Sequence, residues 1–232
     1  AVDQAETEQQ QAFHLNRDVP AQIGSWAARH GALVIHYSTD YVFDGSKRTP
    51  YLESDPTAPL NVYGRSKLEG DQALLASGCD HLIFRVSWVY GMRGNNFLLT
   101  LRRLMQGRDS LNIVDDQFGA PTWCHTIAQT TTDVLTRLPG NATERRSLCG
   151  LYQLSPHGKT SWFGFASRIR DSLGLACDLV PIPSNEYPTP AERPMNSRMD
   201  PSKLEQAFGL SMPTWEDELA LCLEPWSDDA AS

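Results

Sequence analysis

Apolar residues gather along this chain in short continuous runs that are separated by longer stretches of mixed polarity. Residues 32–35 are fully apolar, which is typical of a parallel strand buried on both faces and predicts a strand over residues 33–37. Similar runs predict strands over residues 81–89, 111–114, 151–155 and 179–182. Because helical segments alternate with these strands, the pattern indicates βαβ units and a parallel sheet of the α/β class.

Eight stretches of mixed polarity have the length and the end signals of helices. We expect Asn16 and Thr160 to cap two of them, and Gly31 to end the helix that Asn16 caps. Proline and polar residues predict loops over residues 44–60 and 139–150, and the tail, residues 227–232, is expected to be disordered. The expected helices cover residues 4–14, 17–30, 62–77, 96–106, 122–138, 161–173, 201–208 and 214–223.

Polar side chains follow the first predicted strand directly, as Ser38, Thr39 and Asp40. Ligands of parallel sheets bind beyond the carboxyl ends of the strands. A buried strand that ends in hydroxyls and a carboxylate therefore predicts a functional site at this edge of the sheet, although Asp40 could equally be a turn former.

Composition narrows the classes of function. With 232 residues, 41% hydrophobic, the chain can bury a sizeable core, and its net charge of −8 disfavours nucleic acid and anionic membranes as partners. No apolar run approaches the roughly 20 residues of a membrane span. Five scattered cysteines without a CxxC favour a reduced, cytoplasmic compartment, and six histidines without an HExxH or a Cys/His cluster predict no metal site.

A second candidate group opens the third predicted helix. Tyr63 and Lys67 are four residues apart and share a helix face, so the ammonium is expected to lower the pKa of the phenol. Such a tyrosine can exchange a proton with a carbonyl oxygen, and Thr39 could donate a second hydrogen bond to it. This set is typical of carbonyl/alcohol redox with a nicotinamide. The alternative is an ordinary helix-start tyrosine with a solvated lysine.

Five motifs in order carry a resemblance over nearly the whole chain. They are YSTDYVFDG, APLNVYGRSKLEGD, FRVSWVYG, DQFGAPT and RPMNSRMD, which begin at residues 37, 58, 84, 116 and 193. Together they resemble the dTDP-4-dehydrorhamnose reductases, which are extended short-chain dehydrogenases/reductases. The resemblance implies a Rossmann-like doubly wound parallel sheet with a smaller C-terminal substrate lobe. We expect residues 1–138 to hold the catalytic part, with 90–125 partly in the substrate lobe, and 139–232 to hold that lobe and the last helices.

The resemblance also implies a reaction. The reductases use NADPH or NADH to convert the 4-keto group of dTDP-4-dehydro-L-rhamnose into dTDP-L-rhamnose, for O-antigen and lipopolysaccharide biosynthesis. Tyr63 would give the proton and Lys67 would hold the nicotinamide ribose, with Thr39 assisting. The residues that would contact the dTDP-sugar are Thr39, Asp40, Trp88, Asn95, Asn96, Gln117, Arg193 and Asn196. An Arg193 fork would suit the diphosphate, whereas a plain surface arginine and a core Trp88 are the alternatives.

The family begins with a strand, a Gly-rich turn and a helix that hold the cofactor pyrophosphate. This chain has no such opening, and Gly91–Gly94 lacks the third glycine. We therefore expect a fragment that lacks its first strands, with an exposed strand edge at residues 33–37 and doubtful activity of its own. The residue that selects NADPH over NADH would lie in that segment.

Two rival interpretations stay open. One is a non-catalytic binding subunit, similar to the regulatory beta subunit of methionine adenosyltransferase through SDYVFDG and YGxxK; the other is a related epimerase or dehydratase. The sequence does not determine the oligomeric state. A homodimer is suggested by family members that dimerise through a magnesium site, whose acidic ligands we do not assign here.

Overall fold

A three-stranded parallel sheet lies at the centre of the computed structural model, which describes residues 1–227. Its strand order is β1-β2-β7, with β1 at Leu33–Thr39, β2 at Asp80–Val86 and β7 at Gly150–Gln153. β1 and β2 pair from Leu33 opposite Asp80 to Thr39 opposite Val86. The α/β class and the parallel sheet are therefore confirmed. The expected disordered tail lies, beyond Ser227, outside the described residues.

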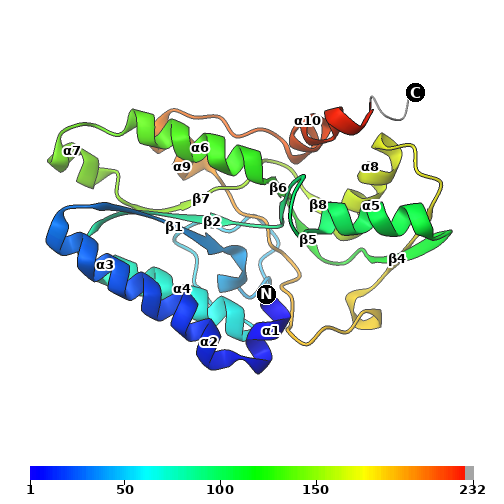
Figure 1. Ribbon diagram of the computed structural model, residues 1–232, viewed down its shortest axis with the longest axis horizontal. Helices are drawn as coiled ribbons and strands as arrows, with labels where there is room; N and C mark the ends of the chain where they lie inside the picture. The colour runs from blue at the N-terminus through cyan, green and yellow to red at the C-terminus, as the bar shows by residue number, and fades with distance from the viewer. Residues whose placement is uncertain (228–232) are drawn as a thin grey trace.

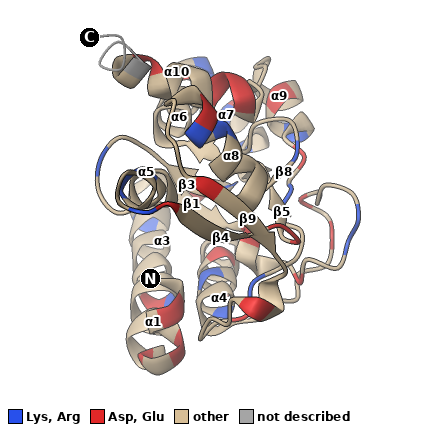
Figure 2. Cartoon of the chain, turned by 90° about the vertical axis from the view of Figure 1, so that its right-hand side faces the viewer, with Lys and Arg blue, Asp and Glu red and all other residues tan. Residues whose placement is uncertain are grey.

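Helices cover both faces of this sheet, as a doubly wound fold requires (Figure 1). On one face, Ile83 of β2 packs with α3, Val19–His30, and α4, Val62–Ala76. On the other face, Leu82 and Phe84 of β2 pack with α6, Cys124–Arg137, and α9, Ser202–Phe208. Alternate residues of a strand point to opposite faces, so the continuous apolar run of β2 supplies both layers. Figure 2, turned by 90°, separates α3 and α4 from α6 in the same way.

The N-terminal helical segment is interrupted at Glu8 and is continuous around Asn16, where the sequence suggested a break. α1, Val2–Thr7, and α2, Gln9–Phe13, are followed by a π-helical turn over His14–Asp18 and then by α3. The expected cap by Asn16 is wrong, because this side chain donates to the Ser66 hydroxyl of α4 at 3.0 Å. The expected end is confirmed, since Gly31 adopts a left-handed φ of 63° after α3.

A second lobe surrounds its own hydrophobic cluster, which includes Leu98, Phe165 and Trp215. Its strands form three pairs, of which β4 with β9 is the longest. The strands are β3 (Val89–Tyr90), β4 (Ser110–Val114), β5 (Phe118–Gly119), β6 (Thr122–Trp123), β8 (Thr160–Ser161) and β9 (Asp178–Ile182). The helices are α5 (Phe97–Gly107), α8 (Trp162–Ser172) and α10 (Trp215–Ser227). Short 3₁₀ turns lie at Asp40–Val42 and Ser184–Glu186.

Three local expectations need correction. The strand predicted over residues 81–89 is split into β2 and β3, because Trp88 between them has a φ of 48°. α8 is capped by Ser161, whose hydroxyl accepts from Gly164 N at 2.9 Å, and not by Thr160. The expected loop 139–150 contains α7, Ala142–Ser147.

The boundary expected at residue 138 does not separate the lobes. β7 pairs with β2 in the central sheet, and Phe208 of α9 packs against Tyr152 of β7. Both elements belong to the sheet body although they follow residue 138. The chain enters the second lobe after β2 and returns to the central sheet with α6, β7 and α9. No single boundary in the sequence therefore separates the two lobes.

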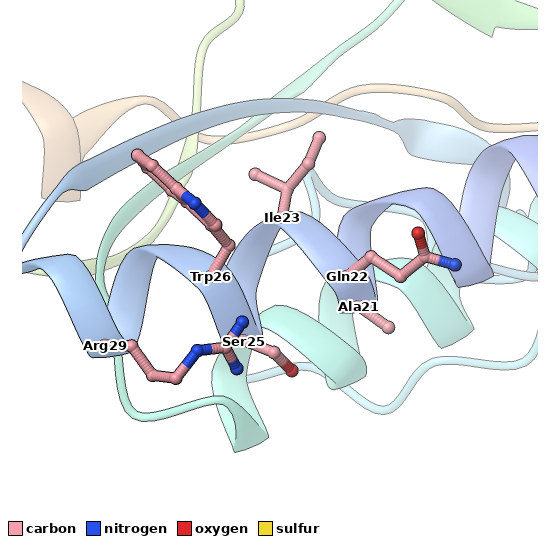
Figure 3. Close-up of a pocket in the computed structure, with 6 residues that line it drawn as sticks. All are labelled: Ala21, Gln22, Ile23, Ser25, Trp26 and Arg29. Atoms are coloured by element: carbon pink, nitrogen blue, oxygen red, sulfur yellow. The ribbon is translucent and has the colours of Figure 1, made fainter.

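β1 is half-buried rather than buried on both faces, because it is the terminal strand of the sheet within residues 1–227. Beside it, α3 presents Ile23 and Trp26, which are 47% and 52% exposed. These side chains line a shallow groove of about 620 Å³ together with Ala21, Gln22, Ser25 and Arg29 (Figure 3). Exposed apolar surface at this strand edge agrees with the expectation from the sequence.

Candidate active site

The candidate site begins where β1 ends. Thr39 is its last residue and is buried, at 4% exposure. The Thr39 hydroxyl accepts a hydrogen bond from Tyr41 N at 3.2 Å and so caps the 3₁₀ turn Asp40–Val42. The same hydroxyl lies 3.2 Å from Asp40 Oδ1, to which it donates. These two contacts hold the hydroxyl at the 3₁₀ turn that follows β1.

α4 brings Tyr63 to this hydroxyl. Asn61 caps the helix by accepting from Gly64 N at 2.8 Å, which makes Tyr63 the second helical residue. Gly64 permits a close approach, because a Cβ there would lie 2.2 Å from the Tyr41 carbonyl oxygen. The Tyr63 ring packs edge-on against Tyr41, with centroids 5.7 Å apart. The glycine of the YGRSK motif thus lets the helix start touch the turn after β1.

The pKa of Tyr63 is raised to about 12, contrary to the expected lowering by Lys67. Burial is the main cause, and the negative charge of Asp40 adds to it, whereas a hydrogen bond with Thr39 acts the other way. Lys67 is not among the groups that shift it. The phenol therefore holds its proton at neutral pH, as a proton donor must.

Lys67 lies deeper, under the end of β1. Its Nζ donates to the Tyr37 carbonyl at 2.5 Å and lies 3.4 Å from His36 Nε2. Burial lowers the Lys67 pKa, and the charge of Asp71 opposes that shift. An ammonium has three N–H donors. The Tyr37 carbonyl takes one of them, and His36 Nε2 takes a second when this nitrogen is unprotonated, so at least one donor is left for another ligand.

Tyr63 also borders a groove of about 170 Å³ between α4 and the N-terminal helices. Gln4, Glu8 and Asn16 contribute polar side chains to its lining, and Ala5 and Leu15 contribute apolar ones. Within residues 1–227, no strand is followed by the Gly-rich turn and helix that cradle a pyrophosphate.

Asp40 is not placed to contact a sugar. It is 2% exposed, and its Oδ2 has no hydrogen-bond partner among the described residues. Burial raises its pKa to about 6, an effect that hydroxyls of Ser197, Thr39 and Ser87 partly offset. Its position in the 3₁₀ turn draws the carboxyl inward, so it acts on Thr39 and Tyr63 from behind.

Trp88 stands at the entrance to the second lobe. Its ring stacks on Trp162 of α8, with centroids 3.5 Å apart and planes 11° apart. A Cβ on Gly119 would lie 2.6–2.9 Å from three atoms of the same ring. Backbone cannot enter between rings 3.5 Å apart, so Gly119 and Trp162 cover opposite faces. A hexose could therefore pack on a face of Trp88 only if Trp162 turned away.

Three expected sugar contacts lie in the same lobe, but they differ in how many hydrogen bonds their side chains already make within the protein. Asn95 is exposed, in the loop before α5. Asn96 caps α5 by accepting from Leu99 N at 3.2 Å and donates to the Gly91 carbonyl at 2.9 Å, so it shapes that loop. Gln117 accepts from Trp162 Nε1 at 3.2 Å, which leaves its amide NH₂ available.

Arg193 and Asn196 are occupied within the chain. Arg193 makes a two-pronged pair with Asp3, with both N–O distances at 2.8 Å, and Nη1 also donates to the Ala191 carbonyl. The fork expected for a diphosphate is thus used by α1. Asn196 is buried and donates to the carbonyls of Lys47 and Thr49, so it ties the loop after β1 to the segment 195–200.

Sequence reasoning missed a buried polar group beneath the site. Asp71 of α4 accepts from Ser38 Oγ at 2.8 Å and from two nitrogens of Arg85 at 3.4 Å. His36 Nε2 lies 3.5 Å from its other oxygen. The available signal was spacing, since Asp71 follows Lys67 by four residues and therefore shares its helix face. Trp162 was also missed, because nothing local connects it with Trp88.

The chain is similar in sequence and in structure to proteins that are already known. The family model described as "RmlD substrate binding domain" matches residues 1–227. The dTDP-4-dehydrorhamnose reductase of Burkholderia thailandensis is 42% identical over 231 residues, covering 96% of this chain and 78% of that protein. Its counterpart from Shigella flexneri is 46% identical over 222 residues, covering 93% and 73%. The crystal structure of dTDP-4-dehydrorhamnose reductase from Bacillus anthracis, in complex with NADP, superposes with a TM-score of 0.87 at 33% identity, covering 96% and 76%.

The chain belongs to the dTDP-4-dehydrorhamnose reductase family. Membership agrees with the resemblance drawn from the five motifs, and it favours a reductase over the binding-subunit interpretation. The dTDP-glucose 4,6-dehydratase DesIV from Streptomyces venezuelae, at 20% identity and a TM-score of 0.76, shares the fold alone. The alignments cover 73–78% of the length of the two reductases compared above.

Proposed function

We propose that this chain reduces the 4-keto group of dTDP-4-dehydro-L-rhamnose and forms dTDP-L-rhamnose, with NADPH or NADH as the reductant. The observation that carries the proposal is the arrangement of Thr39 at the end of β1 and of Tyr63 and the buried Lys67 one helical turn apart on α4, whose Tyr63 ring packs against the turn that follows Thr39. Family membership supplies the substrate class. The place of the reaction is the synthesis of nucleotide sugars for surface polysaccharide.

Proton transfer is the part of the reaction that this chain's own residues perform. The Tyr63 hydroxyl would donate its proton to the ketone oxygen, and the Thr39 hydroxyl would turn its hydrogen from Asp40 Oδ1 to donate a hydrogen bond to the same atom. A pKa of about 12 keeps Tyr63 protonated at neutral pH, which suits the direction of reduction. Oxidation of the alcohol would need the phenolate and should therefore be slow below alkaline pH.

Lys67 and Tyr63 would hold the nicotinamide-ribose end of the cofactor. When bound, NADPH or NADH would supply the hydride that reduces carbon 4. The remaining N–H of Lys67 is available to a ribose hydroxyl, and the groove beside Tyr63 opens toward α1 and α2. The reductase from Bacillus anthracis was solved with NADP, which supports the same class of cofactor here.

The second lobe would hold the nucleotide-sugar. Trp88, Asn95 and Gln117 remain the proposed contacts, with Trp162 as a movable neighbour of Trp88. Asp40, Asn96, Arg193 and Asn196 would instead shape the loops around the sugar through the contacts described above. We propose that the sugar lies between the Thr39–Tyr63 pair and this lobe.

Compartment and assembly complete the proposal. We infer a cytoplasmic reductase, a proposal supported by the five cysteines, which are all free thiols. None of the helices in residues 1–227 combines the length and the apolar content that a bilayer crossing needs. A homodimer, as suggested by the resemblance, is testable by light scattering at several protein concentrations.

The experiment follows NADPH and NADH oxidation with dTDP-4-dehydro-L-rhamnose, on the chain and on two variants. Tyr63→Phe should lose at least about 100-fold in kcat, because it removes the proton donor. Tyr41→Phe is the matched control, since this neighbouring ring packs against Tyr63 and keeps its shape. Equal turnover by the chain and Tyr63→Phe would refute the assigned role.

The binding-subunit alternative predicts a different pair of results. Such a protein would not oxidise NADPH with this substrate, whatever residue stands at position 63. A thermal melt with dTDP alone separates the cases further, because the reductase should be stabilised through its substrate lobe. A folded chain that binds dTDP and never turns over would refute the reductase proposal and leave nucleotide-sugar binding standing.

A further inference from the structure

Beneath the candidate site lies a buried group of charges that proton donation to the substrate does not use. Asp71 is 0% exposed, and Arg85 is 3% exposed. The Asp71 Oδ2 atom receives the hydrogen bonds from Ser38 and Arg85, whereas Oδ1 has no hydrogen-bond partner among the described residues. Leaving a carboxylate oxygen unpaired in the interior is costly. Oδ1 faces His36, whose Nε2 is 3.5 Å away.

His36 connects this carboxylate with Lys67. The same Nε2 atom lies 3.5 Å from Asp71 Oδ1 and 3.4 Å from Lys67 Nζ. Asp71 and Lys67 are also four residues apart on α4, so their side chains leave the same helix face. Lys67 thus has a carbonyl, an imidazole and, beyond the imidazole, a negative charge on its buried side.

Other titratable groups around Lys67 do not replace Asp71. Tyr63 on α4 stays neutral, Arg85 on β2 is a like charge, and Asp40 lies behind Thr39 at the end of β1. Of these groups, Asp71 is the one whose charge supports the Lys67 ammonium against the effect of burial. A charged lysine in this position has three N–H donors and makes a stronger, charge-assisted hydrogen bond to a ribose hydroxyl than the neutral amine would.

We propose that Asp71 is a positioning residue for Lys67: together with His36, its carboxylate keeps the ammonium charged and held at the Tyr37 carbonyl. The inference rests on the proposed function for the importance of Lys67, but the contact network itself does not depend on catalysis. Asp71 touches neither substrate nor cofactor. It acts through Lys67.

The experiment titrates Lys67 directly by NMR, without substrate or cofactor. The chain has four lysines, Lys47, Lys67, Lys159 and Lys203, so ¹³C-labelled lysine gives few signals, and Lys67→Arg assigns the one of interest. In Asp71→Asn the midpoint of Lys67 should fall by about one pH unit, a tenfold rise in its acid constant. In wild-type protein the His36 imidazole signal should shift at the Lys67 midpoint, because the two atoms are 3.4 Å apart.

Asp80→Asn is the matched control. Asp80 is also a buried aspartate paired with arginines, at the opposite end of β2 from Arg85. Its loss should leave the Lys67 midpoint unchanged. If Asp71→Asn does not fold because Arg85 loses its partner, the double variant Asp71→Asn/Arg85→Gln removes both charges, and its Lys67 midpoint should lie below that of Arg85→Gln alone.

Three results would overturn the proposal. The first is a Lys67 midpoint that does not move in folded Asp71→Asn, or that is the same in the double variant as in Arg85→Gln. The second is an equal fall in Asp80→Asn, which would indicate general loosening of the sheet. The third is a wild-type His36 signal that ignores the ionisation of Lys67. If the Lys67 midpoint behaves as expected in all of these proteins but the wild-type chain does not turn over, the result would count against the proposed reaction and not against the role of Asp71.

Discussion

Replacing Asp40 by asparagine should stabilise the protein at neutral pH and have little effect near pH 4. Asp40 is fully buried, and burial raises its pKa to about 6 from an ordinary 3.8. A difference of about two pKa units corresponds to about 3 kcal/mol. Below pH 3.8 both states are protonated and the cost is absent. As the pH rises to 6, the unfolded chain releases the proton first, so the free energy of unfolding falls.

The buried charge of Asp40 lowers the stability of the protein, but the same charge raises the pKa of Tyr63. The negative charge of Asp40 is the second largest cause of the raised Tyr63 pKa. Asp40→Asn should therefore lower the pKa of Tyr63, and the loss of ketone reduction at alkaline pH should begin at a lower pH. A gain in stability with a narrower pH range of activity is what we expect from a residue kept for function.

Urea unfolding at pH 3, 4, 5, 6 and 7 measures this effect on wild type and on Asp40→Asn. Asp44→Asn is a control of opposite sign, since the backbone N–H of Ser46 lowers the pKa of Asp44. That variant should lose stability at neutral pH, and the loss should shrink as the pH falls below 3.8. Glu218, whose pKa is raised to about 7, titrates in all three proteins and cancels. A stability difference between Asp40→Asn and wild type that stays flat from pH 4 to 7 would refute the reasoning.

Three further substitutions test other parts of the structure. Gly119→Ala would place a Cβ 2.6 Å from the Trp88 ring, so it should cost about 1–3 kcal/mol in urea unfolding and weaken dTDP-sugar binding by calorimetry, with NADPH binding unchanged. Asp3→Asn should break the Arg193 fork and lower the free energy of unfolding by no more than about 1 kcal/mol, because Asp3 is 44% exposed; a larger loss would contradict that view. Glu218→Gln should be more stable than wild type at pH 8, and this gain should be smaller at pH 5, since burial raises the Glu218 pKa to about 7. Thermal melts that show a larger gain at pH 5 than at pH 8 would contradict this reasoning.

Local rules were enough to predict where the structure places Thr39, Tyr63 and Lys67, the centre of the candidate site. Thr39 follows a continuous apolar run, and Tyr63 and Lys67 are separated by one helical turn, so strand end and helix face could be predicted from neighbours in sequence. The end of α3 at Gly31 was predictable for the same reason. These features depend on contacts within a few residues, which a sequence displays directly.

Contacts between distant segments decided the rest. The partner of Arg193 is Asp3, 190 residues away, and the partners of Asn196 are carbonyls almost 150 residues earlier. The ammonium of Lys67 was expected to lower the pKa of Tyr63, but burial of the phenol raises it and Lys67 is not among the groups that shift it. Charge and burial from the surrounding fold therefore changed the role of residues whose positions were correctly foreseen.

The transfer of a labelled hydride tests the central claim most directly. The chain is incubated with NADPH or NADH that carries deuterium at nicotinamide carbon 4, together with dTDP-4-dehydro-L-rhamnose, and the sugar is analysed by mass spectrometry and NMR. The account predicts dTDP-L-rhamnose with one deuterium at carbon 4, formed by wild type and Tyr41→Phe and lost in Tyr63→Phe. A folded wild-type chain that binds dTDP but leaves the ketone unlabelled and unreduced with either cofactor would contradict it.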